Sequence, residues 1–349
     1  MIAQLTEALT EADAISAAVL AADGLLRSAG IPAALFVGRG GDRVGAGAES
    51  AEGISRLSRE DCLLYQFSTG SALNDWFAAA PCRRGLVYQN ITPAEFFEPY
   101  DPVLADRLRW GREQLAEIAP RADFAIASSS YSARELRQLG CERVHVLSVP
   151  VRFERYGEAA DPELKKRLSD GKKNILFVGR QAPNKCIEDV ILFTDYYAAA
   201  TGEPCRAVLP GERSLQGYVR ALDALKTDIE VFAPGRISHA QLIAAYETAD
   251  LFLCMSEHEG FCVPLTESMY FGVPVLAYAA TAVGETLGEG AQLFDKKDFP
   301  AVAERMYSLL HDEALRERTA AAQKERLSAF APERWAEQLL AILRSEGVL

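Results

Sequence analysis

The stretch that most constrains the fold of this chain lies between residues 251 and 274. It opens with the apolar run Leu251–Met255, which is typical of a strand buried in a parallel sheet. A polar loop containing Gly260 follows, and Pro264 then suits the first turn of a helix, because the missing proline N–H costs nothing there. The order strand, loop, helix is the repeating unit of an open α/β sheet, so we predict that fold class.

The start of the predicted helix is also a predicted ligand site. In open α/β sheets, ligands bind beyond the carboxyl ends of the strands, and the backbone N–H groups that open the next helix attract anions. We therefore expect an anionic ligand to contact the residues that lead from the loop into the helix, namely Gly260, Phe261, Cys262 and Val263.

Two carboxylates, Glu259 and Glu267, flank this helix start. Neither can lie directly against a phosphate without strong repulsion, so both should face groups that donate hydrogen bonds, such as sugar hydroxyls. The pattern predicts a ligand that carries both phosphate and several hydroxyl groups.

Both glutamates lie within the segment SEHEGFCVPLTESMYFGVPVLAY, which closely resembles the donor-site motif of a known family. This family is the retaining glycosyltransferases of family four (glycosyltransferase group 1), which have the GT-B fold. The resemblance implies that Glu259 lies beside the donor sugar as the catalytic residue and that Glu267 binds the ribose of the nucleotide. If the spacing of the two glutamates were the only evidence, an ordinary loop with two solvated glutamates would explain it. The adjoining EGF, Pro264 and GVPV favour the donor site.

A second motif follows the predicted strand Asn174–Val178, where Gly179 makes a tight turn. The next residues include Arg180 and Lys185, which match the R-x4-K pair that holds the donor diphosphate in the same family. Two fixed cations suit this role, because the leaving diphosphate gains negative charge as the glycosidic bond breaks. The alternative is a solvated arginine and lysine on a surface loop. With these cations present, we expect that no metal is required.

The loop after the predicted strand Ile229–Ala233 is the third candidate contact with the donor. In the resembling family this loop borders the nucleobase, so Arg236 and Ile237 are candidates, although both also suit an ordinary loop. Ser238 is a plausible N-cap for a helix from His239 to Glu247.

The first half of the chain alternates between apolar strands and helices, which predicts a doubly wound domain. A helix is predicted from Ala14 to Ser28, because Gly30 just beyond it is a typical signal for the end of a helix. The predicted strands are Ile2–Leu5, Ala33–Val37, Cys62–Phe67, Leu86–Gln89, Phe124–Ala127 and Val144–Leu147.

Candidate acceptor-side residues follow two of these strands. The segment LVYQNITPAEFF resembles a strand-end motif of bacterial polysaccharide glycosyltransferases in which a histidine commonly precedes the asparagine, but this chain has Gln89 before Asn90. A hydrogen-bonded polar turn explains Gln89 and Asn90 nearly as well. Ser71 is a further acceptor-side candidate and is equally suited to cap a helix.

The resemblance implies an α/β protein of the GT-B class, in which two Rossmann-like doubly wound domains face a cleft. We predict an N-terminal acceptor domain over residues 1–155 and a C-terminal nucleotide-sugar donor domain over residues 156–331, with residues 151–173 as the linker. The amphipathic segment Pro332–Gly347 carries Trp335 and several leucines near one face. In this class the last helix crosses back, so we assign residues 332–349 to the first domain.

Composition limits the partners and the compartment. The chain has 349 residues, enough for two domains, and its net charge of -12 makes nucleic acid an unexpected partner. The seven cysteines contain no C-x2-C pair, which favours reduced, buried thiols. No apolar run approaches the length of a membrane span, and the N-terminus lacks the pattern of a secretion signal. We expect a cytoplasmic location, with the inner face of the membrane as an alternative.

The resemblance to family four implies a retaining hexosyltransferase that moves a sugar from a nucleotide-diphosphate sugar onto a glycan or lipid-linked acceptor in cell-surface polysaccharide assembly. We expect the donor nucleotide to be UDP rather than GDP, and no cofactor besides the sugar nucleotide. Peripheral association with a membrane is compatible with this function. One alternative is a regulatory protein of the same fold that binds a nucleotide sugar without catalysis. The other is an NAD-dependent oxidoreductase, but the first loop (residues 6–16) lacks the glycines of the dinucleotide motif.

Overall fold

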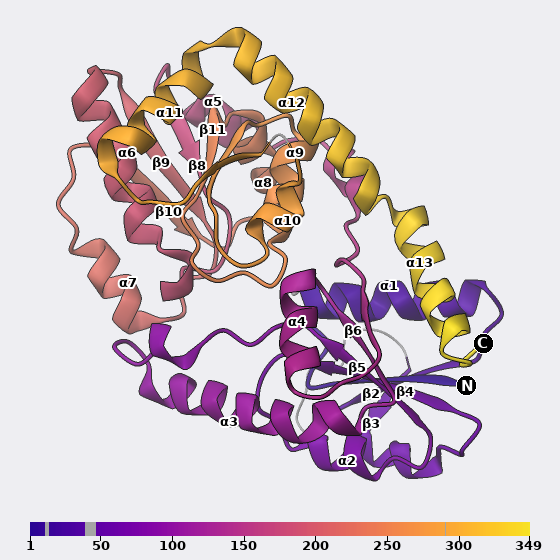
Figure 1. Cartoon of the computed structure of the whole chain (residues 1–349). Helices are drawn as coiled ribbons and strands as arrows, with labels where there is room; N and C mark the ends of the chain where they lie inside the picture. The colour runs from indigo at the N-terminus through magenta and orange to yellow at the C-terminus, as the bar shows by residue number, and fades with distance from the viewer. Residues whose placement is uncertain (11–13, 39–46, 290) are drawn as a thin grey trace. The chain divides into compact units, whose positions relative to one another are not determined.

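The computed structural model describes residues 1–10, 14–38, 47–289 and 291–349, so part of the first loop, residues 11–13, lies outside the described residues. The chain divides into two compact units, each built around a parallel sheet (Figure 1). The first unit consists of Met1–Ala94, Val103–Pro150 and Phe330–Leu349, and the second of Glu95–Pro102 and Val151–Ala329.

Among the described residues, the first unit contains a seven-stranded sheet in the order β3-β2-β1-β4-β5-β6-β7. Every neighbouring pair is parallel, and β1 and β4 are buried along their whole length, as expected for strands covered on both faces. The strands are β1 (Ile2–Thr6), β2 (Ala33–Val37), β3 (Ala48–Ser50), β4 (Cys62–Phe67), β5 (Arg83–Tyr88), β6 (Phe124–Ala127) and β7 (Val144–Val146).

Two helices that are distant in sequence, α1 and α13, pack against one apolar cluster of this sheet (Figure 1). Ala22 and Leu26 of α1 meet Trp335 and Leu343 of α13 in this cluster, together with apolar residues of the strands. The last helix thus belongs to the first unit, as the resemblance implies. The helices of this unit are α1 (Ala14–Ser28), α2 (Leu73–Ala79), α3 (Pro102–Ile118), α4 (Ser130–Gln138) and α13 (Pro332–Ser345).

A buried carboxylate at the end of α13 anchors this helix to the sheet. Glu346 is 5% exposed and accepts hydrogen bonds from Arg83 at 2.8 Å and Arg143 at 3.2 Å, while His145 Nε2 lies 2.7 Å from its other oxygen. Burial alone would raise the pKa of Glu346, but hydrogen bonds with His145, Arg83 and Arg143 outweigh it and lower the pKa below its ordinary value of 4.5.

We expect Glu346→Gln to destabilise the protein by about 1–3 kcal/mol at pH 7, because the charged acceptor of three partners is lost. Since the folded-state pKa of Glu346 is lowered, its contribution is present above its ordinary pKa of 4.5 and disappears as the pH falls through the lowered value. Thermal unfolding of parent and variant at pH 7 and in acid measures this effect. The exposed Glu337 on the same helix provides the control substitution Glu337→Gln, and an equal loss for both variants would contradict the anchor.

The second unit contains a six-stranded parallel sheet in the order β10-β9-β8-β11-β12-β13. Strands β8 and β11 are neighbours at its centre, so the loops that follow them meet at one edge of the sheet. The strands are β8 (Lys173–Leu176), β9 (Cys205–Pro210), β10 (Glu230–Gly235), β11 (Leu251–Cys254), β12 (Val275–Tyr278) and β13 (Gln292–Phe294).

Helices join the strands of the second unit, and several of them pack on each other, among them α6 with α11, α9 with α12 and α5 with α8. The helices are α5 (Pro162–Leu168), α6 (Ile187–Thr201), α7 (Gln216–Asp223), α8 (His239–Glu247), α9 (Val263–Tyr270), α10 (Val283–Leu287), α11 (Phe299–His311) and α12 (Glu313–Leu327). None of the helices within the described ranges combines the length and the hydropathy needed to cross a membrane.

The predicted linker over residues 151–173 is wrong, because most of this segment is folded into the second unit. A 3₁₀ turn spans Phe153–Gly157, and α5 then begins at Pro162. The side chain of Asp161 caps this helix by accepting a hydrogen bond from the N–H of Leu164 at 2.7 Å. Proline after an aspartate cap is a helix start, not a mark of a linker.

The predicted boundary between the two domains also misses the segment Glu95–Pro102, which packs with the second unit. The ring of Tyr100 lies edge-on to Tyr218 at 5.1 Å between centroids, and Phe97 lies under the guanidinium of Arg180 at 5.8 Å. Gly217 permits this close packing, because a Cβ there would lie 2.6 Å from the carbonyl oxygen of Tyr100. These contacts explain why the segment belongs to the second unit although it lies between two stretches of the first.

Candidate functional site

The loop between β11 and α9 carries the strongest candidate residues, and the structure confirms its predicted form. Strand β11 ends at Cys254, α9 begins at Val263, and Pro264 lies in the first helical turn. Cys262 joins loop and helix with φ of 75°, a left-handed conformation that is rare for residues with a side chain. Such strain persists where the surroundings fix it, which marks this turn as a functional candidate.

Hydrogen bonds from three other segments hold this loop in place. The Glu259 N–H donates to Thr281 Oγ1 at 2.8 Å, and that hydroxyl donates to the Glu259 carbonyl at 2.9 Å. Thr286 donates to the carbonyl of Phe261 at 2.6 Å, and the amide of Asn184 donates to the carbonyl of His258 at 2.9 Å. The loop is therefore fixed before any ligand binds, as an electrostatic site requires.

The structure brings two predicted site residues, Glu259 and Lys185, into an ion pair. Lys185 Nζ lies 2.5 Å from Glu259 Oε2, and the side chains are 22% and 5% exposed. Burial by itself would lower the pKa of Lys185, but the nearby carboxylate of Glu259 outweighs it and the pKa is raised. Lys185 therefore remains a cation and Glu259 has a fixed partner at the carboxyl edge of the sheet.

Arg180 lies on the turn after β8, where the backbones of Gly179 and Gly211 approach each other closely. Gly211, with φ of 151°, permits this approach, because a Cβ there would lie 1.7 Å from the carbonyl oxygen of Gly179. The side chain of Arg180 is exposed and lies over the ring of Phe97. Partial burial lowers the pKa of Arg180, and the charges of Glu212 and Asp101 oppose this effect. An exposed arginine whose guanidinium lies over an aromatic ring is suited to binding an anion.

Glu267 is buried in α9, and two tyrosines bind it. Tyr156 donates to Glu267 Oε1 at 2.6 Å and Tyr246 donates to Oε2 at 2.5 Å. Burial raises the pKa of Glu267 above its ordinary value, while the two hydroxyls oppose this effect. Each oxygen retains capacity to accept a further hydrogen bond, as binding of a ribose diol requires. Sequence reasoning did not identify Tyr156 or Tyr246.

The candidates beside the predicted nucleobase site form one loop at the start of α8. Arg236 donates to Glu212 Oε2 at 2.6 Å at the surface, and Ile237 is half-buried. Ser238 caps α8 together with Gln241, which confirms the predicted helix start. The ring of His239 in the first turn stacks on Tyr156 at 5.7 Å between centroids, so this loop and the tyrosines around Glu267 are neighbours.

The acceptor-side candidates all lie in the first unit and take part in internal hydrogen bonds. Gln89 Nε2 donates to Gln66 Oε1 at 3.1 Å, and both line a small pocket under α1 and α13. Asn90 is left-handed with φ of 71° and donates to Ser132 Oγ at 2.9 Å. The hydroxyl of Ser71 donates a hydrogen bond to the carboxylate of Glu7.

Two kinds of comparison identify similar proteins. Residues 161–326 match the family described as Glycosyl transferases group 1. A GDP-mannose-dependent alpha-mannosyltransferase of Mycolicibacterium smegmatis is 31% identical over 186 residues, which cover 53% of this chain and 46% of that protein. The O-antigen chain mannosyltransferase B of Escherichia coli is 23% identical over 220 residues, which cover 61% and 58%. The alignment with the mycobacterial protein thus spans about half of that relative's length.

Solved structures resemble the whole chain. The Anabaena protein Alr3699/HepE, in complex with UDP and glucose, superposes with a TM-score of 0.73 over 99% of both chains at 17% identity. Sucrose-phosphate synthase of Thermosynechococcus elongatus superposes with a TM-score of 0.73 at 16% identity, covering 99% of this chain and 98% of that one. At these identities the likeness establishes the fold, which is that of two Rossmann-like α/β domains as in GT-B glycosyltransferases.

Proposed function

We propose that this chain, whose residues 161–326 belong to the glycosyl transferases group 1 family, transfers a sugar from a nucleotide-diphosphate donor to a glycan or lipid-linked acceptor, with retention of anomeric configuration. The observation that carries the proposal is the ion pair between Lys185 and Glu259, which lies beside the first turn of α9. Cell-surface glycan assembly is the proposed setting, because one relative is named as an O-antigen chain mannosyltransferase.

The charges in the second unit suit departure of a nucleoside diphosphate. When the bond between the anomeric carbon and the diphosphate oxygen breaks, negative charge grows on the diphosphate and positive charge grows on the sugar. Lys185 and Arg180 are the proposed partners of the diphosphate, helped by the N–H groups that open α9. Glu259 is the proposed partner of the developing positive charge. Since these groups already supply the stabilisation, we propose that turnover requires no divalent metal.

Glu267 is the proposed ribose ligand. One of its oxygens accepts a hydrogen bond from Tyr156 and the other accepts one from Tyr246, and the two bonds fix the carboxylate in one orientation. A fixed carboxylate can accept from two neighbouring ribose hydroxyls without losing side-chain entropy on binding. The adjoining loop with Arg236 and Ile237 is the proposed nucleobase contact, and UDP is the proposed nucleotide.

The experiment that tests the function has two parts. Thermal unfolding is measured with UDP, GDP, ADP and TDP. A ligand that binds only the folded state raises the free energy of unfolding, by about 2.7 kcal/mol at a hundred times its Kd, and therefore raises the melting temperature. Sugar transfer from the matching nucleotide sugar is then followed by mass spectrometry, with and without EDTA. We expect UDP to give the largest shift and product to form in EDTA. A larger shift with GDP would reject UDP, and binding without transfer to any glycan or lipid-linked acceptor would favour the regulatory alternative.

We expect Glu267→Gln to weaken the binding of UDP and of uridine by the same factor, about 10- to 100-fold, because the ribose is common to both ligands. Pyrophosphate, which has no ribose, should bind parent and variant equally and is the control. Isothermal calorimetry measures all three affinities. If uridine affinity is unchanged in the variant, the ribose assignment of Glu267 is wrong.

A further inference from the structure

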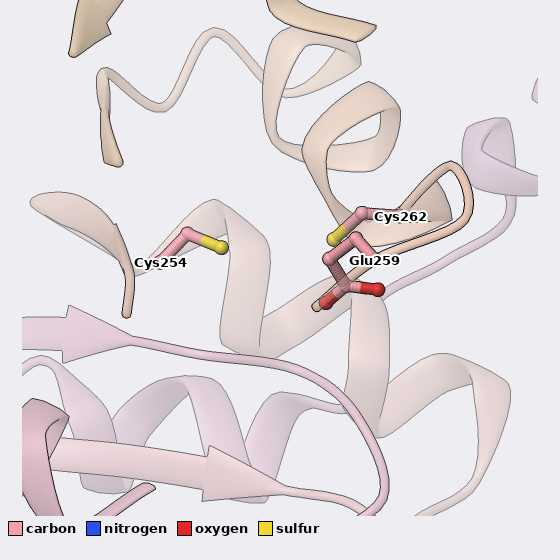
Figure 2. A group of neighbouring side chains, drawn as sticks. All are labelled: Cys254, Glu259 and Cys262. Atoms are coloured by element: carbon pink, nitrogen blue, oxygen red, sulfur yellow. The ribbon is translucent and has the colours of Figure 1, made fainter. Parts of the chain in front are cut away.

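We infer that Cys254, Glu259 and Cys262 form a binding site for a soft divalent cation such as Zn²⁺, and that a cation bound there withdraws Glu259 from sugar transfer. Figure 2 shows the two sulfur atoms turned toward one another, with the carboxylate of Glu259 beside them. One ligand atom from each of the three residues lies within 4.8 Å of the other two. The inhibitory part of this inference rests on the proposed function, whereas cation binding does not.

The positions of the three residues follow from the loop that joins β11 and α9. Cys254 is the last residue of β11 and Cys262 is the residue before α9, so the loop returns the second thiol to the first. Both thiols are free and buried. Zinc–sulfur bonds of about 2.3 Å in a tetrahedral site would require only a small closure of these side chains.

The carboxylate of Glu259 has one oxygen available to a cation. Its Oε2 is held by Lys185, but Oε1 is buried and has no hydrogen-bond partner among the described residues. The residue is 5% exposed, and a buried carboxylate oxygen without a partner carries a free-energy cost that a ligand can remove. The unpartnered oxygen is therefore a second observation, separate from the closeness of the two thiols, and it points to a ligand at the same cluster.

The charges also balance when a divalent cation occupies the cluster. Two thiolates and one carboxylate carry three negative charges, the cation carries two positive charges, and Lys185 adds the one that neutralises the remainder. Buried charges persist only when they are paired, so the neighbouring lysine favours an occupied site of this composition. Thiolate ligands select zinc and other soft cations over magnesium or calcium. Cation binding releases the thiol protons to solvent.

A second group of potential ligands, Cys186, Asp189 and Glu257, is a weaker candidate and serves as the control. Lys297 Nζ lies 2.6 Å from an oxygen of Asp189 and 2.7 Å from an oxygen of Glu257, so one cationic side chain already joins these carboxylates. Glu257 is also exposed, and this group offers only one thiol.

Co²⁺ is the probe for the site, because cobalt bound to thiolates gives a charge-transfer absorption that oxygen ligands do not give. We expect the reduced parent protein to develop this band with one equivalent of Co²⁺ and to lose it when Zn²⁺ is added. Cys186→Ala should behave as the parent does, whereas Cys254→Ala should lose the band. Glu259→Gln keeps both thiols and should bind Co²⁺ at least about tenfold more weakly. A band of equal strength in Cys254→Ala and the parent would overturn the site.

Transfer activity tests the consequence of binding. We expect Zn²⁺ to inhibit the parent and Cys186→Ala, EDTA to restore activity, and Cys254→Ala to retain activity in Zn²⁺. Thermal unfolding of Cys254→Ala verifies its fold. If the cobalt band forms but Zn²⁺ leaves transfer unchanged, the link to Glu259 is wrong. If no preparation transfers sugar, the proposed function fails, and the cobalt titration still decides whether the site exists.

Discussion

Glu259→Gln is expected to give a folded protein that binds nucleotide as the parent does and transfers sugar about a hundred- to a thousand-fold more slowly. The substitution keeps the size of the side chain and removes its charge. That charge matters most when the anomeric carbon becomes positive, so its loss should lower kcat far more than nucleotide affinity. The expected loss of roughly 2.7–4 kcal/mol is that measured when one preorganised electrostatic group is removed.

The matched control is Glu257→Gln, two residues away on the same loop. Glu257 is exposed and pairs with Lys297, so the same chemical change there should leave kcat nearly unaltered. Calorimetry with UDP and product formation by mass spectrometry are measured on the same preparations. If Glu259→Gln transfers sugar at the parent rate, Glu259 leaves the mechanism and the regulatory alternative gains support.

The predicted secondary structure around the candidate site is confirmed where local chemistry decides it. A run of buried apolar residues, then Gly260, then Pro264 admits few arrangements other than strand, loop and helix, and α9 begins at the expected place. Ser238 followed by Gln241 forms a capping box, which is also encoded within four residues. Such signals need no knowledge of distant parts of the chain.

The partners of the site residues were not predictable in this way. Tyr156 is 111 residues from Glu267 in sequence, and Lys185 is 74 residues from Glu259. Lys185 meets Glu259 because β8 and β11 are neighbours and the segments after them lie at one edge of the sheet, whereas Tyr156 reaches Glu267 from the 3₁₀ turn Phe153–Gly157. A single sequence gives the order of the strands along the chain but not their order in the sheet.

Sequence reasoning missed two short strands at sheet edges. Strands β3 and β13 have three residues each, and each is the last strand of its sheet. An edge strand has a neighbour on one side only, so it needs neither a long apolar run nor a regular alternation.

The ion pair between Lys185 and Glu259 yields the second large effect. We expect Lys185→Met to destabilise the protein by about 3 kcal/mol, because the 5%-exposed carboxylate of Glu259 loses its partner. At about 2–4 °C for each kcal/mol, the melting temperature should fall by roughly 6–12 °C. Affinity for UDP should fall as well, while affinity for uridine should not, because only UDP carries the diphosphate.

The double variant Lys185→Met/Glu259→Gln separates stability from catalysis. Replacing both members of a buried ion pair removes the stranded charge, so the melting temperature should recover most of its loss while transfer stays slow. The control is Lys165→Met. Its ion pair with Glu247 has a similar distance of 2.6 Å, but the side chains are 51% and 34% exposed, so the cost should be no more than about 1 kcal/mol. If Lys165→Met and Lys185→Met cost the same, the Glu259 carboxylate is solvated and its pairing with Lys185 contributes nothing specific to the site.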